Sequence, residues 1–258
     1  MVSIPVGMFL VFQIEIGHTH GTDMKTNKGK ISDPTFKAAP PKASATRKGQ
    51  ASRGRILDAA LHVFRSKGYA ATTVDDLCRE SGVTKGSFFH HFASKEEAAL
   101  AAIEHWMGAT SRLFAEAPYW KVADPRQRLL AYLDFRAGLV HGDLPEFTCL
   151  LGTLVQETFA SHPVLRAACD AGVESHAQTL VSTIEEARKR YAPQADWNAE
   201  SLARHTQTVL QGAFVIAKAA NDPTRVLDAI AHLKRYVEML FPQPLKGDFH
   251  EDRTVSVL

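Results

Sequence analysis

Cysteine is scarce in this 258-residue chain, with only Cys78, Cys149 and Cys169, which lie far apart. An odd, scattered set excludes a disulfide framework and a Cys-x-x-Cys zinc site, and it favours the reducing cytoplasm. Long apolar runs are lacking as well, so we expect no membrane span. We also find no glycine-rich phosphate loop and no Ser/His/Asp set, so no enzyme activity and no cofactor are expected.

The first apolar stretch, VGMFLVFQIEIG, does not have the features of a signal peptide. No Lys or Arg precedes it, it is short, and Gln13 and Glu15 interrupt it. One explanation is that Met24 is the true start of the protein and that residues 1–23 are an upstream extension. N-terminal sequencing of the native protein would decide between the two starts.

Acidic residues are almost absent between residues 24 and 55, where Asp33 is the only one. The same segment is rich in bases, namely Lys25, Lys28, Lys30, Lys37, Lys42, Arg47, Lys48, Arg53 and Arg55. Prolines and glycines are scattered through residues 24–50, and large apolar side chains are few. We therefore expect a disordered N-terminal extension over residues 1–50, basic from residue 24.

Strand-like alternation is also lacking, and from Ser52 onward the apolar residues recur at helical spacing. The pattern predicts a first helix that ends near Gly68 and a second that begins after Thr73 and ends at Gly82. A third short helix should follow Thr84 and run to Phe92, and a fourth should begin at Ser94.

The rest of the chain reads as further helices with breaks at Pro118, Pro125, Pro145, Pro163, Pro193 and Pro223. The prediction is therefore an all-α fold, in which a three-helix head precedes a larger helical body. We place the head at residues 51–97 and the body at residues 98–245. Residues 246–258 should form a loose tail.

The stretch TKGSFFHHF, residues 84–92, raises the question of a metal site. Side chains of adjacent helical residues diverge by about 100°, so His90 and His91 are poorly placed to hold one metal ion, and no third ligand is at helical spacing. Phe88 and Phe92 are four residues apart and define an inward face. His90, His91, Ser87 and Lys85 should therefore point outward or to the flank, and no metal is expected.

Two short helices joined by a tight turn at Gly82, with Lys, Ser and His projecting from the second, form a helix-turn-helix pattern. Such a second helix can enter the major groove of double-stranded DNA. Residues 55–103, RILDAALHVFRSKGYAATTVDDLCRESGVTKGSFFHHFASKEEAALAAI, resemble the DNA-binding head of the TetR family of bacterial repressors. The resemblance covers about a fifth of the chain and includes the Gly-aromatic turn, the Thr-Thr cap and Phe-His-His-Phe.

The resemblance implies a role for each matching position of the head. In members of the family, bases or nearby backbone are contacted by the positions that match Thr84, Lys85, Gly86, Ser87, Phe89 and His90. Phosphates tend to be contacted by the positions that match Thr73, His91 and Lys95. Physical chemistry agrees for most of them, since lysine donates to guanine and glycine permits close approach. Phe89 departs from the usual tyrosine and lacks its hydroxyl. Solvated surface lysines and a purely capping Thr73 remain alternatives, and the basic segment is either an inert tail or a phosphate-tracking extension.

The resemblance also implies that the body binds a small effector, whose identity the sequence leaves unknown, and forms a homodimer through its last two helices. The apolar stripes that match are Leu202, Val209, Ala213, Ile216 and Ala217, followed by Val226, Ile230, Leu233, Val237 and Leu240. Ordinary intrachain core would explain the same stripes. A twofold dimer predicts a palindromic operator, to which a repressor would bind more weakly once the effector is present.

Cys149 lies in FTCLLGTLVQETF, which is similar to a segment of electrophile- and oxidant-responsive members of the family. A buried structural cysteine is the competing interpretation, because no cation is near in sequence to activate the thiol. Gln156 and His176 are further candidates for the effector site. The competing interpretation is that they face water, as most polar side chains of such helices do. The remaining alternative for the whole chain is a helical interaction protein that does not bind DNA.

Overall fold

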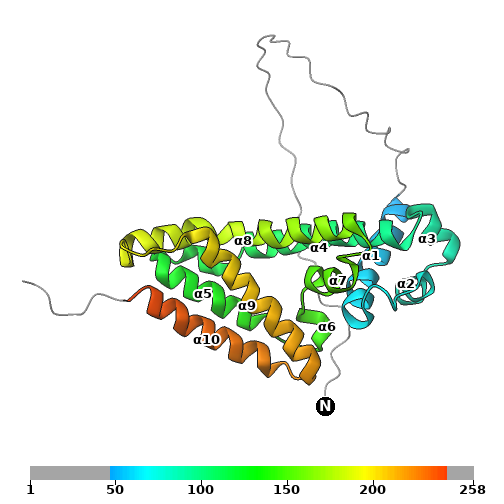
Figure 1. The fold of residues 1–258 in the computed structure, drawn as a ribbon. Helices are drawn as coiled ribbons and strands as arrows, with labels where there is room; N and C mark the ends of the chain where they lie inside the picture. Colours follow the sequence, from blue (N-terminus) through cyan, green and yellow to red (C-terminus); the bar gives the residue numbers. More distant parts are fainter. Residues whose placement is uncertain (1–46, 243–258) are drawn as a thin grey trace, which may run out of the picture. The chain divides into compact units, whose positions relative to one another are not determined.

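The computed structural model describes residues 47–242, which form ten α-helices and one 3-10 helix (Figure 1). This range contains no strand, so the all-α fold class is confirmed. Residues 1–46 and 243–258 lie outside the described residues. The expected upstream extension, most of the basic segment and the expected loose tail therefore lie outside as well.

The head consists of α1 (Arg47–Lys67), α2 (Val74–Ser81) and α3 (Lys85–His91). α1 begins at Arg47, so the expectation of disorder is wrong for residues 47–50. The predicted start at Ser52 rested on apolar periodicity, which the first turn of α1 lacks. Arg, Lys and Gln are nevertheless good helix formers and extend the helix upstream.

The predicted ends of the head helices are confirmed by their caps. Gly68 and Gly82 follow α1 and α2 with φ of 82° and 64°, a region that suits glycine. Thr73 and Asp76 form the reciprocal capping box, and the Thr84 hydroxyl accepts from the Ser87 N–H. Local sequence signals therefore determine where α2 and α3 begin.

The body follows as α4 (Lys95–Ala115), η1 (Pro118–Lys121), α5 (Pro125–Gly138), α6 (Leu144–Phe147), α7 (Leu150–Thr158), α8 (Pro163–Tyr191), α9 (Ala199–Ala220) and α10 (Thr224–Leu240). The six prolines fall in first turns or connectors, as predicted. In Figure 1, α4 and α8 run side by side, α5, α9 and α10 lie beneath them, and α6 and α7 lie next to the head. No helix among residues 47–242 is long and apolar enough to cross a membrane.

The cap of α4 differs in one detail from the predicted capping box. The Ser94 side chain accepts from the Glu97 N–H, as predicted. The Glu97 carboxylate accepts from the Ala93 N–H at 2.6 Å, one residue before the cap. The acidic side chain thus still satisfies a free amide at this helix end.

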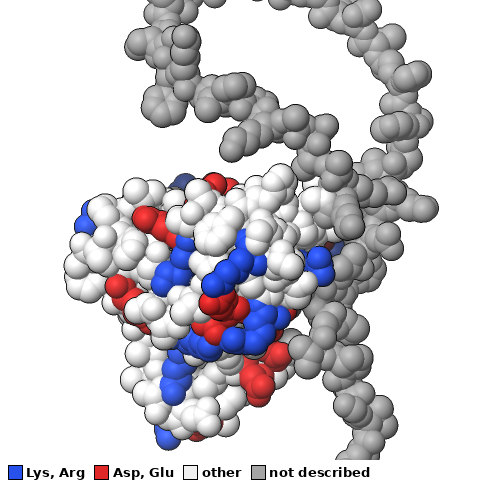
Figure 2. Space-filling model, turned by 90° about the vertical axis from the view of Figure 1, so that its right-hand side faces the viewer, with Lys and Arg blue, Asp and Glu red and all other residues white. Residues whose placement is uncertain are grey.

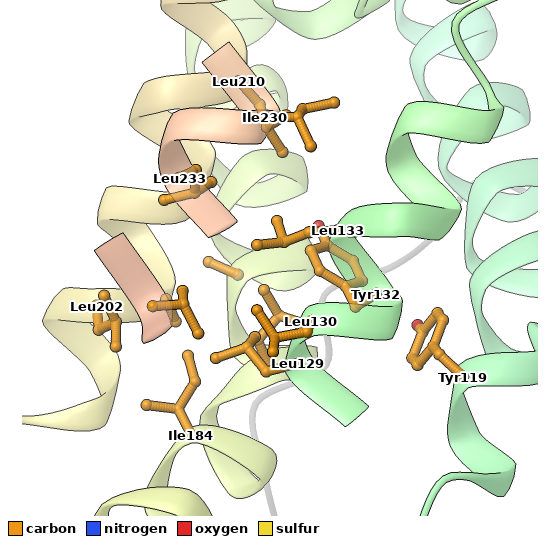
Figure 3. Packing of buried hydrophobic residues seen from close by; sticks show 14 of the residues in the cluster. Tyr119, Leu129, Leu130, Tyr132, Leu133, Ile184, Leu202, Leu210, Ile230 and Leu233 are labelled. Atoms are coloured by element: carbon orange, nitrogen blue, oxygen red, sulfur yellow. The ribbon is translucent and has the colours of Figure 1, made fainter. Parts of the chain in front are cut away.

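Two apolar clusters hold the structure together. In the body, side chains of α5, α8, α9 and α10 meet, among them Leu133, Ile184, Leu210 and Leu233 (Figure 3). The second cluster joins the head to Leu150, Leu151 and Leu154 of α7 and to the start of α8. The head core therefore extends beyond residue 97, and residues 51–97 share it with the body.

The two apolar stripes considered for dimerisation are mostly intrachain core, as the alternative interpretation held. Leu202, Ala213 and Ala217 are buried, and so are Val226, Ile230, Leu233 and Val237. Only Ile216 of the two stripes is strongly exposed, at 56%. Sequence spacing alone does not separate the two interpretations, because α9 carries apolar residues on more than one side.

Polar contacts add to this shared core at the turn between α1 and α2. The Glu157 carboxylate of α7 accepts from the Ala70 N–H at 2.6 Å, and Lys95 of α4 donates to the carbonyls of Tyr69 and Thr72 at 2.8 Å. Gly68 leaves room for Glu157, since a Cβ there would lie 1.9 Å from its Oε1. This turn is therefore held by two helices of the body.

The Gly68→Ala variant should lower the free energy of unfolding by about 1–2 kcal/mol, because alanine is strained at positive φ and displaces Glu157. The matched control is Gly54→Ala within α1, where an added Cβ meets nothing within 4 Å. That change should raise the same quantity by about 0.4–1 kcal/mol. Urea unfolding of both variants checks the prediction, and a loss of the same size in both would contradict it.

Candidate nucleic-acid interface and effector site

The helix α3 has the two faces predicted for it. Phe88 and Phe92 are buried at 0% and 2% exposure and anchor the helix in the head core. Lys85, Gly86 and His90 are exposed, and Phe89 is 54% exposed although it is aromatic. The outward face of α3 thus combines a cation, an imidazole and an apolar ring on one accessible surface.

Lys85 is paired with Asp75 of α2 in the free protein. Its Nζ lies 2.8 Å from Asp75 Oδ1, and both side chains are more than 60% exposed. The contact raises the pKa of Lys85. Because exposed pairs contribute little to stability, Lys85 can leave Asp75 for a stronger acceptor at small cost.

His91 lies at the flank of α3, against α1. Its Nε2 is 2.6 Å from the Ser52 hydroxyl, and the Arg53 guanidinium stacks 5.3 Å from the centre of the Phe92 ring. Burial lowers the pKa of the His91 imidazole, and His90 and Arg53 lower it further. The pattern of residues 84–92 did not reveal Arg53, whose place beside α3 comes from the packing of α1.

Thr73 and Lys95 have roles within the fold. Thr73 is an exposed residue, but its hydroxyl is engaged in the capping box of α2, where it accepts from the Asp76 N–H and donates to the Asp76 carboxylate. The Lys95 ammonium sits 4.3 Å from the centre of the Tyr69 ring as well as on two carbonyls, and burial lowers its pKa. Phosphate contacts by these two residues stay predictions. Lys95 already uses two of its three N–H donors on backbone carbonyls, so fewer are left for a phosphate.

The head is nearly neutral, with seven Lys and Arg against six Asp and Glu in residues 51–97. Figure 2 shows blue and red side chains beside one another on the end of the molecule that carries the head. Lys67 and Arg79 both pair with Asp76, and Lys85 pairs with Asp75. Sequence-blind attraction of this surface for DNA should therefore be modest, and recognition should depend on specific contacts of α3.

The candidate effector residues fall into two places. Cys149 and Gln156 line one small crevice between α7 and α9, together with Thr153, Gln211 and Lys218. His176 lies elsewhere, 4.4 Å from Phe114 between ring centres and 3.0 Å from the Tyr132 hydroxyl. Burial lowers the pKa of His176 to about 3, so it is neutral at physiological pH. The three residues do not form one site.

Cys149 is partly buried and packs against both apolar clusters, so it combines contact with the core and some exposure. Cys78 and Cys169 are buried, and burial raises the pKa of Cys169 to about 12. The fold also brings Arg65 and Lys218 near Cys149 from distant parts of the chain. Cations absent from the neighbouring sequence are thus present in space.

No group of three His, Cys, Asp or Glu residues within the described part of the chain is arranged to hold a metal ion.

Comparison with known proteins agrees with this architecture. Residues 56–102 match the model of bacterial regulatory proteins of the tetR family, and residues 125–233 match the model of the tetracyclin repressor-like C-terminal domain. Together these matches cover more than half of the chain. The chain belongs to the TetR family.

Individual TetR relatives match either at low identity or over a short stretch. The regulator AcuR of Cereibacter sphaeroides is 29% identical over 169 residues, which is 63% of this chain and 74% of AcuR. YerO of Bacillus subtilis is 43% identical over only 54 residues, 21% of this chain and 19% of YerO. A TetR regulatory protein from Rhodobacter sphaeroides has a TM-score of 0.64 at 27% identity, covering 74% of this chain and 98% of that one.

Membership of the TetR family makes the protein a DNA-binding transcriptional regulator and not an enzyme. It also implies binding to an operator through the head and an effector-binding C-terminal domain. The alternative of an interaction protein that does not bind DNA is thereby set aside.

Proposed function

We propose that the protein is a repressor that binds a palindromic operator as a homodimer and releases it when a small effector binds the body. The observation that carries the proposal is the outward face of α3, where Lys85, Phe89 and His90 are accessible while Phe88 and Phe92 hold the helix rigidly. In a bacterial cell this DNA lies in the cytoplasm, where the protein would act.

The residue roles follow from the accessible atoms. Lys85 would donate to guanine O6 or N7, Ser87 would hydrogen-bond a base edge, and Gly86 would let the helix approach. The Phe89 ring would pack on a sugar or a thymine methyl group. Thr84 and His90 would contact bases or adjacent backbone, and Thr73, His91 and Lys95 would contact phosphates.

A homodimer is supported by apolar side chains that stay exposed on α9 and α10. Ile216 projects from α9, and Leu227, Tyr236 and Met239 project from α10, the last at 79% exposure. α9 and α10 pack against each other, and the rings of His205 and Tyr236 meet at 5.4 Å. A second copy would cover this surface and place two α3 helices one DNA turn, about 34–36 Å, apart.

A second candidate function is thiol sensing by Cys149. Cys149 is only partly buried and lines the crevice, and Arg65 and Lys218 lie near it, as in the partly exposed, electropositive surroundings typical of reactive cysteines. In this version, reaction of Cys149 with an electrophile or oxidant would replace effector binding as the signal for operator release.

The role of Lys85 predicts a loss of sequence preference in Lys85→Ala. Against a duplex selected from random DNA by the wild-type protein, the variant should lose roughly 1–3 kcal/mol of discrimination over a scrambled duplex. Fluorescence anisotropy at two salt concentrations measures both affinities. Lys189→Ala is the matched control, since Lys189 is an equally exposed lysine paired with an acid, Glu185, on α8. Equal discrimination in all three proteins would contradict the assignment.

The dimer proposal predicts that sedimentation velocity will show twice the 28.4 kDa mass of the chain. Ile216→Asp should shift the protein to the monomer, because it places a charge in the proposed interface. Val164→Asp is the control, since Val164 is 58% exposed but lies on α8. A wild-type protein that sediments as a monomer, or a shift of equal size in both variants, would refute this interface.

A further inference from the structure

Two cations meet between head and body without a carboxylate partner. Arg65 is 5% exposed, and Lys218 is partly buried. None of the ion pairs within residues 47–242 includes either residue. Burying a positive charge away from water and from any anion costs free energy, so two such cations at one place favour a site that an anion occupies.

The nearest acids are already committed to backbone amides. The Glu157 carboxylate accepts from the Ala70 N–H at 2.6 Å, and the Glu146 carboxylate accepts from the Asp143 N–H at 3.1 Å. They act on Lys218 and Arg65 only from beyond ion-pair distance. Burial lowers the pKa of Lys218, and repulsion by Arg65 lowers it further. The positive charge at this junction is therefore not balanced by an ion pair within the described chain.

The Arg65 guanidinium donates its hydrogen bonds to carbonyl groups of the protein. Lys218 is therefore the cation of the two that is available to a ligand in the crevice. Arg65 donates to the carbonyls of Leu61 and Glu146 at 2.8 and 2.9 Å and stacks 4.9 Å from the centre of the Trp106 ring. Lys218 donates to the Arg65 carbonyl at 3.0 Å and to the Thr153 hydroxyl at 2.8 Å. Unlike Arg65, Lys218 lines the crevice between α7 and α9.

The lining of this crevice suits an organic anion. Gln211 brings an amide group that can donate, and Gln156, whose amide nitrogen donates to the Gly152 carbonyl at 2.7 Å, keeps a second N–H, while Phe214 and Val215 add an apolar wall. The open volume is about 20 Å³, room for about one water molecule. Gln211 packs where a Cβ on Gly152 would lie, 2.1 Å from its Oε1. Rotation of the Gln156 and Gln211 side chains would have to widen the crevice for an organic anion to enter.

We propose that the crevice between α7 and α9 is the effector site and binds a small organic anion, with Lys218 as its cation and an apolar end of the ligand against Phe214 and Val215. The inference rests on the proposed effector-responsive function and names the class of ligand. Neutral or cationic effectors would leave the charge of Lys218 unbalanced and bind poorly.

The same geometry couples the anion to the DNA-binding head. The ammonium of Lys218 that would meet the anion also holds the carbonyl of Arg65, a residue of α1. An ammonium has three donors, and two are already used inside the protein. A bound anion that turns the ammonium toward itself weakens the link between α9 and α1, so operator affinity should fall.

The test uses the full chain at constant ionic strength, with sodium chloride replaced stepwise by sodium acetate, butyrate or benzoate. Thermal unfolding should show a saturable rise in Tm of about 2–4 °C with at least one of them. Lys218→Met should abolish the rise, and Gln211→Ala should shift its midpoint to higher concentration. Lys189→Met, a charge removal on the surface of α8, should behave as wild type.

Two further arms separate the possible explanations. Cys149→Ser should keep the rise, because Lys218 holds the anion and no thiol is needed, and a loss of the rise in this variant would contradict that assignment. A missing rise in wild type, or an equal rise in Lys218→Met, would also overturn it. Operator binding without added anion is measured in parallel. Its absence would contradict the proposed regulator function while a Lys218-dependent rise would still establish the anion site.

Discussion

The arrangement of head and body depends on the buried apolar core that the head shares with α7 and the start of α8. At the edge of that core the Ala70 N–H donates a solvent-exposed hydrogen bond to the Glu157 carboxylate. It fixes the turn between α1 and α2 to the end of α7. Lys95 of α4 donates hydrogen bonds to two carbonyls of the same turn. Gly68 has no Cβ, which leaves space for the Glu157 carboxylate. Hydrogen bonds to charged groups are stronger than neutral ones, so a single short turn can carry this connection.

The apolar core makes the same connection below the surface. Phe88 and Phe92 of α3 share a cluster with Leu150 and Leu154 of α7. α3 and α7 thus share one packed cluster, and one side of α7 lines the crevice that contains Lys218. A change at the crevice has a short path of packed side chains to α3, since close-packed interiors transmit displacement. The exposed apolar faces of α9 and α10 would turn such a movement into a change in the distance between two heads.

The sequence predicts the local features of this structure well and the long-range ones poorly. Thr73, Gly82 and Thr84 end or begin helices through hydrogen bonds within a few residues, so their pattern is visible in the sequence. The inward position of Phe88 follows equally from helical spacing. Arg65 and Lys218 are 153 positions apart, and no sequence pattern shows that they meet beside Cys149. Lys95 likewise resembles a surface lysine until the fold supplies the carbonyls of Tyr69 and Thr72. The exposed face of α9 escaped prediction because its buried face is equally apolar.

Amide hydrogen exchange at Ala70 tests most directly whether the end of α7 holds the head in place. In Glu157→Ala the exchange of the Ala70 N–H should accelerate by about tenfold or more, as expected from losing a bond to a charged group. Operator affinity should fall in the same variant. The control Glu174→Ala removes an exposed acid of α8 that contacts Arg204, and it should change neither quantity. Unchanged exchange at Ala70 together with unchanged operator affinity in Glu157→Ala would contradict the account.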